Sequence, residues 1–333
     1  MSGSARLGDA TAELARALER RLDDLAGAGH RVEDLHPMAG GASRETWGLT
    51  AVQPDGVREA LVLRRDPPSE PRPDEMRQEA AALEAAARHG VPVPRLRDHG
   101  SGSDVVGAPY LLMEHVEGEA LARRILRDDT FAAARGVLAR DLGRAAAAIH
   151  SIDPGEVADD LAPDGMEVLW QRYVETDVPR PVIDLAFRWL ADRRPSPVPA
   201  RLVHGDFRLG NVLVGPAGLT AVLDWELVHS GDPLEDLGYL GIRAWRFGGP
   251  HPVAGVGSFA ELFEAYEAAG GGYVDPDRVR WWQIAGTLSW GVNAIFQASR
   301  HFRGTTRSVE LAAVGRRVVE QEHDLLRMID EES

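Results

Sequence analysis

The sequence predicts an α+β protein in which a small mixed lobe precedes a larger, mainly helical one. Short strand-like segments separated by turns occupy the first part, with one Ala-rich helix among them, whereas after residue 118 apolar residues recur mostly at helical spacing. The 333 residues suffice for about two structural units with a sizeable core. We therefore expect an N-terminal helix at 1–29, a small lobe at 30–115 and a larger lobe at 116–333, joined near Glu114–Gly118.

Each element of the small lobe follows from a local pattern. An amphipathic helix is expected at 11–26, where leucines recur at helical spacing, and an Ala-rich helix at 74–89 is closed by Gly90. Gly and Pro turns separate the strands. The expected strands or extended segments are 32–35, 46–50, 59–63, 91–94 and 108–115.

The larger lobe is predicted from long apolar faces. Only one strand-rich patch interrupts the helical pattern, with short strands at 202–203, 212–214 and 221–223. The expected helices are 131–149, 166–175, 182–192, 258–269, 278–300 and 308–330.

Composition excludes several classes of chemistry. The chain has no Cys, and all 37 basic residues are Arg, so disulfides, thiolate nucleophiles, Cys-ligated zinc, Schiff bases and a Walker A loop are ruled out. A net charge of -15 without a basic stripe argues against nucleic-acid binding, and no apolar run reaches the length of a membrane span. The opening residues lack a secretory signal, so we expect a cytoplasmic protein.

The chemistry is concentrated in the strand-rich patch. Asp206 and Asn211 are five residues apart between short apolar strands, and Asp224 ends the next strand. An Asp can accept a hydroxyl proton, while carboxylate and amide oxygens suit Mg²⁺ together with nucleotide phosphates. The alternative without catalysis is a hydrogen-bonded turn. We disfavour it because a third polar residue, Asp224, follows at the end of the next strand.

These residues resemble the protein-kinase-like superfamily and, more closely, the aminoglycoside phosphotransferase family. The run His204-Gly205-Asp206, Asn211 five residues after the Asp, Asp224-Trp225 and then Gly231-Asp232-Pro233 carry the resemblance, which extends from about residue 30 to the end. It implies a two-lobe kinase-like fold whose small lobe has an antiparallel sheet and one helix. It also implies that Asp206 is catalytic, that Asn211 and Asp224 bind Mg²⁺, and that His204 is a scaffold.

The resemblance also implies a nucleotide site in the small lobe. Gly40, Gly41, Ala42 and Ser43 would cover the phosphates, although the same residues also suit an ordinary hairpin. A strand cation would pair with a helix glutamate, and since the chain has no Lys we choose Arg64, with Arg65 as the alternative, and Glu79 over Glu84. The segment that includes Glu114 and Val116 resembles the hinge that binds adenine, or else a plain edge strand.

The acceptor is the least determined part of the prediction. Trp245, Trp281, Trp282 and Trp290, with Asn293 and Gln297, either line a pocket or belong to the core, and we favour the core. Glu226, Asp232 and Glu235 are acidic candidates for a cationic acceptor, whereas Asp236 is preferred as a residue that fixes the loop. Motifs at both ends of the chain look more like phosphotransferase domains fused to acyl-CoA dehydrogenases.

The sequence therefore predicts an Mg²⁺-dependent phosphotransferase that moves the γ-phosphoryl group of ATP to a small-molecule hydroxyl, with GTP not excluded. One alternative is a kinase of hydroxy-acids or hydroxyacyl-CoA, which needs the opposite pocket charge to a cationic sugar. The other is a nucleotide-binding regulatory module, suggested by the missing lysine. Oligomeric state is not predicted.

Overall fold

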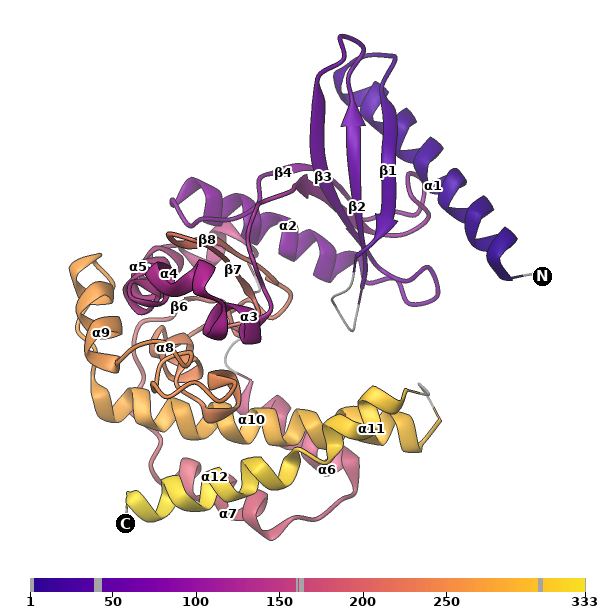
Figure 1. Cartoon of the computed structure of the whole chain (residues 1–333). Coiled ribbons are helices and arrows are strands. Elements are labelled where there is room, and N and C mark those ends of the chain that lie inside the picture. The colour runs from indigo at the N-terminus through magenta and orange to yellow at the C-terminus, as the bar shows by residue number, and fades with distance from the viewer. Residues whose placement is uncertain (1–2, 39–43, 160, 162–164, 305–307, 333) are drawn as a thin grey trace. The chain divides into compact units, whose positions relative to one another are not determined.

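A computed structural model describes residues 3–38, 44–159, 161, 165–304 and 308–332. Its contacts divide the chain into two compact units (Figure 1). Unit 1 comprises Met1–Arg88 and Pro92–Glu117, and unit 2 comprises His89–Val91 and Gly118–Ser333.

Unit 1 is built on a five-stranded antiparallel sheet. The strand order is β1-β2-β3-β5-β4, so β5 is inserted between the third and fourth strands of the chain. The strands are β1 (Arg31–Pro37), β2 (Glu45–Val52), β3 (Arg58–Arg65), β4 (Leu96–Gly100) and β5 (Tyr110–Glu114).

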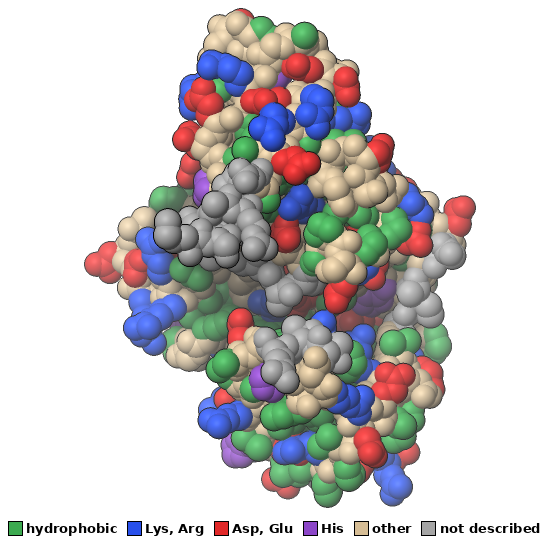
Figure 2. All heavy atoms as spheres, turned by 90° about the vertical axis from the view of Figure 1, so that its right-hand side faces the viewer, with side chains coloured by type: hydrophobic (Ala, Val, Ile, Leu, Met, Phe, Trp, Pro, Cys, Tyr) green, Lys and Arg blue, Asp and Glu red, His purple; other side chains and the backbone are tan. Residues whose placement is uncertain are grey.

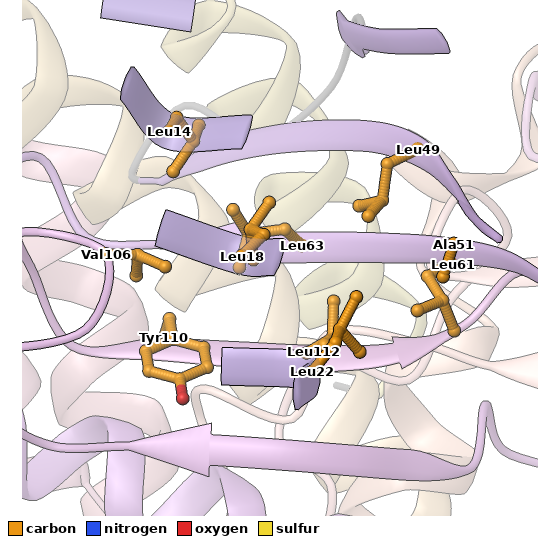
Figure 3. Close-up of a cluster of buried hydrophobic side chains, with 10 residues drawn as sticks. All are labelled: Leu14, Leu18, Leu22, Leu49, Ala51, Leu61, Leu63, Val106, Tyr110 and Leu112. Atoms are coloured by element: carbon orange, nitrogen blue, oxygen red, sulfur yellow. The ribbon is translucent and has the colours of Figure 1, made fainter. Parts of the chain in front are cut away.

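Helix α1 (Gly3–Ala26) covers one face of this sheet. Its leucines Leu14, Leu18 and Leu22 are buried, and they pack against a row of sheet residues that alternate along the strands. Figure 3 shows this cluster, in which the sheet contributes Leu49, Ala51, Leu61, Leu63, Tyr110 and Leu112, and the segment before β5 contributes Val106. The apolar face of α1 is thus the reason why the helix stays on the sheet.

Helix α2 (Pro73–Arg88) lies on the opposite face. Side chains alternate between the faces of a strand, so Arg64 points away from the α1 side on which its neighbour Leu63 is buried. Arg64 there contacts Glu79, which is on α2. Unit 1 therefore has three layers, helix, sheet and helix, and the contact between Arg64 and Glu79 lies on the α2 side.

Unit 2 is mainly helical, and helix α10 (Pro276–Phe302) is its longest element. Asp275 caps the start of α10 by accepting the Asp277 N–H, and Pro276 occupies the first turn. The other helices are α3 (Ala122–Arg127), α4 (Ala132–Arg135), α5 (Leu138–His150), α6 (Met166–Thr176), α7 (Pro181–Asp192), α8 (Leu234–Leu240), α9 (Phe259–Ala268), α11 (Val309–Gly315) and α12 (Val318–Glu331).

Two small antiparallel ladders interrupt the helices of unit 2. Strand β6 (Arg201–Val203) pairs with β9 (His229–Gly231), and β7 (Val212–Gly215) pairs with β8 (Gly218–Val222). The polar residues singled out in the sequence lie next to these strands: His204, Asp206 and Asn211 between β6 and β7, and Asp224 just after β8. The ladders thus bring the loop 204–211 and the segment after β8 into one region of unit 2.

Two long helices expected from the sequence are each divided in the structure. The segment 131–149 is split at Gly136 and Val137 into α4 and α5, consistent with the poor helix propensity of Gly and Val. The segment 308–330 is split after Gly315, where an added Cβ would lie 2.4 Å from Ala298 Cβ of α10. Close packing of α11 on α10 therefore coincides with the end of that helix.

The described surface mixes charges of both signs. On the face seen in Figure 2, acidic and basic side chains are interspersed and form no single basic stripe. None of the helices in the described part of the chain combines the length and apolar character that a membrane crossing requires.

Candidate active site

The loop that carries Asp206 is held by a buried carboxylate of helix α8. Asp236, with no exposed surface, accepts the backbone N–H groups of His204 at 2.9 Å and Gly205 at 3.0 Å. Its Oδ2 also lies 3.0 Å from His150 Nε2. Burial by itself raises the pKa of Asp236, but the hydrogen bonds from the His150 side chain and the His204 backbone, with both imidazoles close by, outweigh it, so the pKa lies below its usual value. The expected loop-fixing role of Asp236 is confirmed.

His204 is a scaffold residue, as the resemblance implied. The side chain is fully buried, its Nε2 lies 3.0 Å from the Leu223 carbonyl oxygen, and its Nδ1 accepts the Asp206 N–H at 3.3 Å. The two contacts define one neutral tautomer, with the proton on Nε2. His204 thereby joins the loop of Asp206 to the segment that precedes Asp224.

Gly205 has a backbone that only glycine adopts easily. Its φ is +80°, and an added Cβ would lie 2.4 Å from the Leu227 carbonyl oxygen. The loop therefore passes too close to the segment before β9 for any side chain. This approach places Asp206 directly after the turn.

Both oxygens of Asp206 are in contact with neighbours in the same loop. Asn211 Nδ2 donates to Asp206 Oδ2 and to the Asp206 carbonyl oxygen, the latter at 3.0 Å. Arg208 Nε donates to Asp206 Oδ1 at 2.8 Å. Since the amide nitrogen of Asn211 faces Asp206, its amide oxygen is the end that can bind a cation.

Arg208 is a site residue that the sequence reasoning missed. Its guanidinium lies over the Trp245 ring, 4.4 Å from the centroid, and Trp245 packs on Trp290 at 4.9 Å. The charge of Asp206 also acts on Tyr239, because burial first and then this charge raise the pKa of the phenol far above its usual value. The position of Arg208 two residues after Asp206 was the available signal.

Asp224 lies at the end of the β7–β8 ladder that carries Asn211. Val212 pairs with Val222, and the Leu223 N–H donates to the Asn211 carbonyl oxygen at 2.8 Å, so Asn211 and Asp224 lie at the same end. The backbone of Asp224 has φ of 67°, the left-handed region that Asp tolerates better than most residues. Within the described ranges no group of three or more His, Asp and Glu side chains could hold a metal by itself.

In unit 1 the structure pairs Arg64 with Glu79. Arg64 Nη1 lies 2.6 Å from Glu79 Oε1, and the Glu79 side chain is 1% exposed. Arg65, the alternative cation, instead contacts Glu45 and the Val106 carbonyl oxygen, and Glu84 is exposed. The sequence choice between the alternatives therefore agrees with the observed contacts, while a role in binding nucleotide stays a prediction.

The other nucleotide-site candidates are less informative. Gly40, Gly41, Ala42 and Ser43 lie outside the described residues. Glu114 ends β5 and donates its N–H to the Arg95 carbonyl oxygen, so only its own carbonyl could meet a base. Val116 follows β5 outside any helix or strand and is half-buried.

Most of the aromatic residues belong to the core, as expected. Trp281 and Trp282 are buried, and their N–H groups donate to the Leu190 carbonyl oxygen and to Asp232. Trp245 is also buried, but it contacts Arg208 and so forms one wall next to Asp206. Asp232 pairs with Arg278 and accepts the Leu234 N–H just before α8, so its contacts are structural.

Comparison with known proteins identifies the family. The family model described as "Phosphotransferase enzyme family" (APH) matches residues 34–282. The chain belongs to this phosphotransferase family. The match includes β2, β3, the Asp206 loop and Asp224, so the candidate site lies in the shared part.

Curated relatives of this family member are acyl-CoA dehydrogenase family members. Member 10 of Mus musculus is 31% identical over 198 residues, which is 54% of this chain and 18% of that protein. Member 11 of Rattus norvegicus is 31% identical over 201 residues, 55% of this chain and 25% of that protein. The chain thus matches about a fifth to a quarter of the length of these relatives.

Solved structures show that the phosphotransferase fold extends over nearly the whole chain. A Ralstonia eutropha protein assigned as an aminoglycoside phosphotransferase has a TM-score of 0.72 at 22% identity, covering 95% of this chain and 98% of that one. The GDP complex of aminoglycoside 2'-phosphotransferase-IIIa has 0.67 at 14%, covering 94% and 99%. A complex of APH(4)-Ia with AMP-PNP and hygromycin B has 0.61 at 18%, also covering 94% and 99%. At these identities the likeness establishes the kinase-like fold.

Proposed function

We propose that this phosphotransferase transfers the γ-phosphoryl group of ATP to a hydroxyl of a small molecule. The observation that carries the proposal is the joint placement of Asp206, Asn211 and Asp224 by one loop and one ladder. The complexes of structural neighbours with AMP-PNP and GDP support a nucleotide co-substrate, and GTP remains an alternative to ATP.

The donor set next to Asp206 fits Mg²⁺. Asn211 offers an amide oxygen and Asp224 a carboxylate, and hard oxygen donors in small number are what Mg²⁺ uses when phosphates and water complete its shell. When bound, the ion would neutralise charge on the nucleotide phosphates. Asn211 also fixes the Asp206 side chain, so the metal site and the catalytic carboxylate are coupled.

Asp206 would orient the acceptor hydroxyl and take its proton. Phosphoryl transfer passes through a loose transition state, so positioning contributes more than base strength. The loop supplies that positioning through the bonds from Asp236, His204 and Asn211. In unit 1 Arg64, held by Glu79, would bind the α- and β-phosphates.

The test is nucleotide turnover against a mixed panel of aminoglycosides, macrolides, sugars, hydroxy-acids and hydroxyacyl-CoAs. ADP release should depend on Mg²⁺, be stimulated by one class, and fall about 10²- to 10⁴-fold in Asp206→Asn. Asp192→Asn, an exposed residue on α7, is the matched control and should keep wild-type turnover. Equal turnover in wild type and Asp206→Asn would refute the catalytic role.

A second acceptor class is favoured by the charges of unit 2. Arg208 places a cation at Asp206, and the Trp245 ring under its guanidinium adds an apolar wall at the same place. Such surroundings suit an anionic, partly apolar acceptor such as a hydroxy-acid or hydroxyacyl-CoA better than a polycationic sugar. The names of the curated relatives point to acyl thioesters as well. In the panel this class should then exceed the aminoglycosides.

The same panel separates an enzyme from a regulatory module. If ATP or GTP binds but no acceptor raises turnover above that of Asp206→Asn, the chain acts by binding nucleotide. The replacement of lysine by Arg64 is the feature that favours this outcome.

A further inference from the structure

Arg44 is a buried arginine to which the proposed reaction assigns no role. Its side chain has no exposed surface, its Nε lies 3.2 Å from Asp66 Oδ1, and its Nη1 forms an ion pair with Glu79 Oε2. Asp66, also fully buried, accepts the Arg72 N–H at 2.7 Å. Burying an arginine is costly unless carboxylates and hydrogen bonds compensate, and here two carboxylates do so.

The contacts of Arg44 tie three elements of unit 1 together. Arg44 directly precedes β2, Asp66 directly follows β3, and Glu79 is on α2. All three lie on the α2 side of the sheet, where Arg64 also points. Arg44 is therefore in direct contact with Glu79, the α2 carboxylate that contacts Arg64.

Glu79 is divided between the two arginines. Arg64 Nη1 contacts Oε1, whereas Arg44 Nη1 contacts Oε2. An arginine and a carboxylate prefer a two-pronged arrangement in which two nitrogens bind both oxygens. A two-pronged pair between Arg64 and Glu79 would require Oε2 to accept from Arg44 and Arg64 together, which would bring two guanidinium charges onto one oxygen.

We propose that Arg44 is a positioning residue that sets the direction of the Arg64 guanidinium. By occupying one oxygen of Glu79 it restricts Arg64 to a one-nitrogen contact and keeps the guanidinium from turning fully toward α2. The inference rests on the proposed function, since it matters for binding only if Arg64 meets nucleotide phosphates. Without Arg44, Arg64 would form the two-pronged pair and move away from them.

This mechanism makes a prediction that a purely structural role does not make. A lysine has no planar fork, so it contacts Glu79 through one nitrogen whether or not Arg44 is present. Arg64→Lys should therefore recover nucleotide binding in a chain that lacks Arg44. If Arg44 merely stabilised unit 1, the effects of the two substitutions would be independent.

The experiment is a double-substitution cycle read by titration of a fluorescent ATP analogue with Mg²⁺. Arg44→Gln should weaken binding about tenfold, which is the usual scale for one charged contact. Adding Arg64→Lys to Arg44→Gln should restore binding by at least about threefold, whereas Arg64→Lys alone should not strengthen it. Unchanged binding in Arg44→Gln, or no recovery in the double variant, would overturn the proposal.

Folding is monitored by the thermal unfolding of each variant. Arg21→Gln is the matched control, because Arg21 makes a two-pronged pair with Asp98 elsewhere in unit 1 and should lower stability without weakening binding. If Arg44→Gln does not fold, Arg44→Lys replaces it. We expect Arg44→Lys to weaken nucleotide binding less than Arg44→Gln, and adding Arg64→Lys should again restore binding. If the wild-type protein binds no nucleotide, the proposed function itself is refuted. If wild type and Arg44→Gln bind nucleotide equally well, only the positioning role of Arg44 is refuted.

Discussion

Asp224 combines a strained backbone with a candidate metal-binding side chain. A left-handed conformation costs an ordinary residue about 1–2 kcal/mol, and Asp or Asn bears it most easily apart from glycine. Asp177, exposed at the end of α6, has φ of 53°, close to the 67° of Asp224. The chain thus contains a matched pair in which only one member lies beside the candidate site.

This pair separates strain from chemistry. Asp224→Ala and Asp177→Ala should each lower the free energy of unfolding by about 1 kcal/mol, because both place alanine at positive φ. Of these two variants, only Asp224→Ala should abolish Mg²⁺-dependent turnover. Asp224→Asn should also abolish it, but with little loss of stability. Denaturant unfolding and ADP release on the same preparations provide the measurements. Wild-type turnover in Asp224→Asn would remove Asp224 from the metal site.

Gly205 gives a second test at the residue scale. Gly205→Ala would add a Cβ 2.4 Å from the Leu227 carbonyl oxygen, so the loop must shift and Asp206 with it. We expect a loss of at least about 2 kcal/mol in stability together with a large fall in turnover. Gly270→Ala is the control, since Gly270 also has positive φ, +92°, but nothing within 4 Å of an added Cβ. Similar losses of turnover in both variants would argue against a specific clash.

Residues next to one another in sequence were predictable, and residues brought together by packing were not. Asp206, Asn211 and Asp224 occur within one short segment whose spacing the flanking strands fix. Arg44 and Arg208 were missed because their partners are set by side-chain direction and burial, which a single sequence does not display. Arg64 and Glu79 could be chosen only because a family resemblance supplied the expectation that they pair.

At the scale of elements, a charged histidine links β9 to α8. His229 Nε2 lies 3.2 Å from Glu235 Oε2, and its Nδ1 lies 3.0 Å from the Leu227 carbonyl oxygen. Burial lowers the pKa of His229, but the Glu235 carboxylate and the second hydrogen bond outweigh it and raise the pKa to about 9. The imidazolium therefore holds β9 to α8, the helix that carries Asp236.

Because the folded pKa of His229 lies above that of the unfolded chain, protonation stabilises the fold. This stabilisation is complete below about pH 6.5 and is lost as the pH rises through about 9, for a total of at most about 3 kcal/mol. Urea unfolding at pH 6 and pH 10 should show the loss in wild type but not in His229→Gln, with exposed His251→Gln behaving like wild type. An identical pH dependence in His229→Gln would contradict the assignment.

Long periodic elements were predicted well and short ones poorly. Helices α6, α7, α9 and α10 agree closely with the apolar spacing. Strand β9 and helix α8 were not predicted, because three and seven residues are too few to show a period. Their positions depend on pairing with β6 and on the bonds of Asp236, which are tertiary contacts.

At the scale of the whole molecule, metal and nucleotide are expected to bind together. The described residues supply few metal ligands of their own, so Mg²⁺ depends on phosphate oxygens for most of its shell. Mg²⁺ alone should leave the unfolding temperature almost unchanged. Mg²⁺ with ATP at 100 times its Kd should stabilise the protein by about 2.7 kcal/mol.

Removing Mg²⁺ with EDTA should reverse most of this stabilisation. The Asp224→Asn variant serves as control, because it should respond to ATP but gain little from Mg²⁺. Differential scanning calorimetry checks both statements. A strong effect of Mg²⁺ without nucleotide would show that a metal site forms independently of the phosphates.

The β7–β8 ladder has a consequence for the order in which the protein folds. Asn211 and Leu223 are bonded within one hairpin, whereas Asp236 reaches back 32 residues to His204. Contacts that are close in sequence form faster, so Asn211 and Asp224, the two proposed metal ligands, should come together before the loop of Asp206 is fixed. Pulsed hydrogen exchange should then protect the Leu223 N–H earlier than the His204 N–H, and the reverse order would contradict this. Asp206, the proposed catalytic carboxylate, would be the last part of the candidate site to become ordered, when α8 docks.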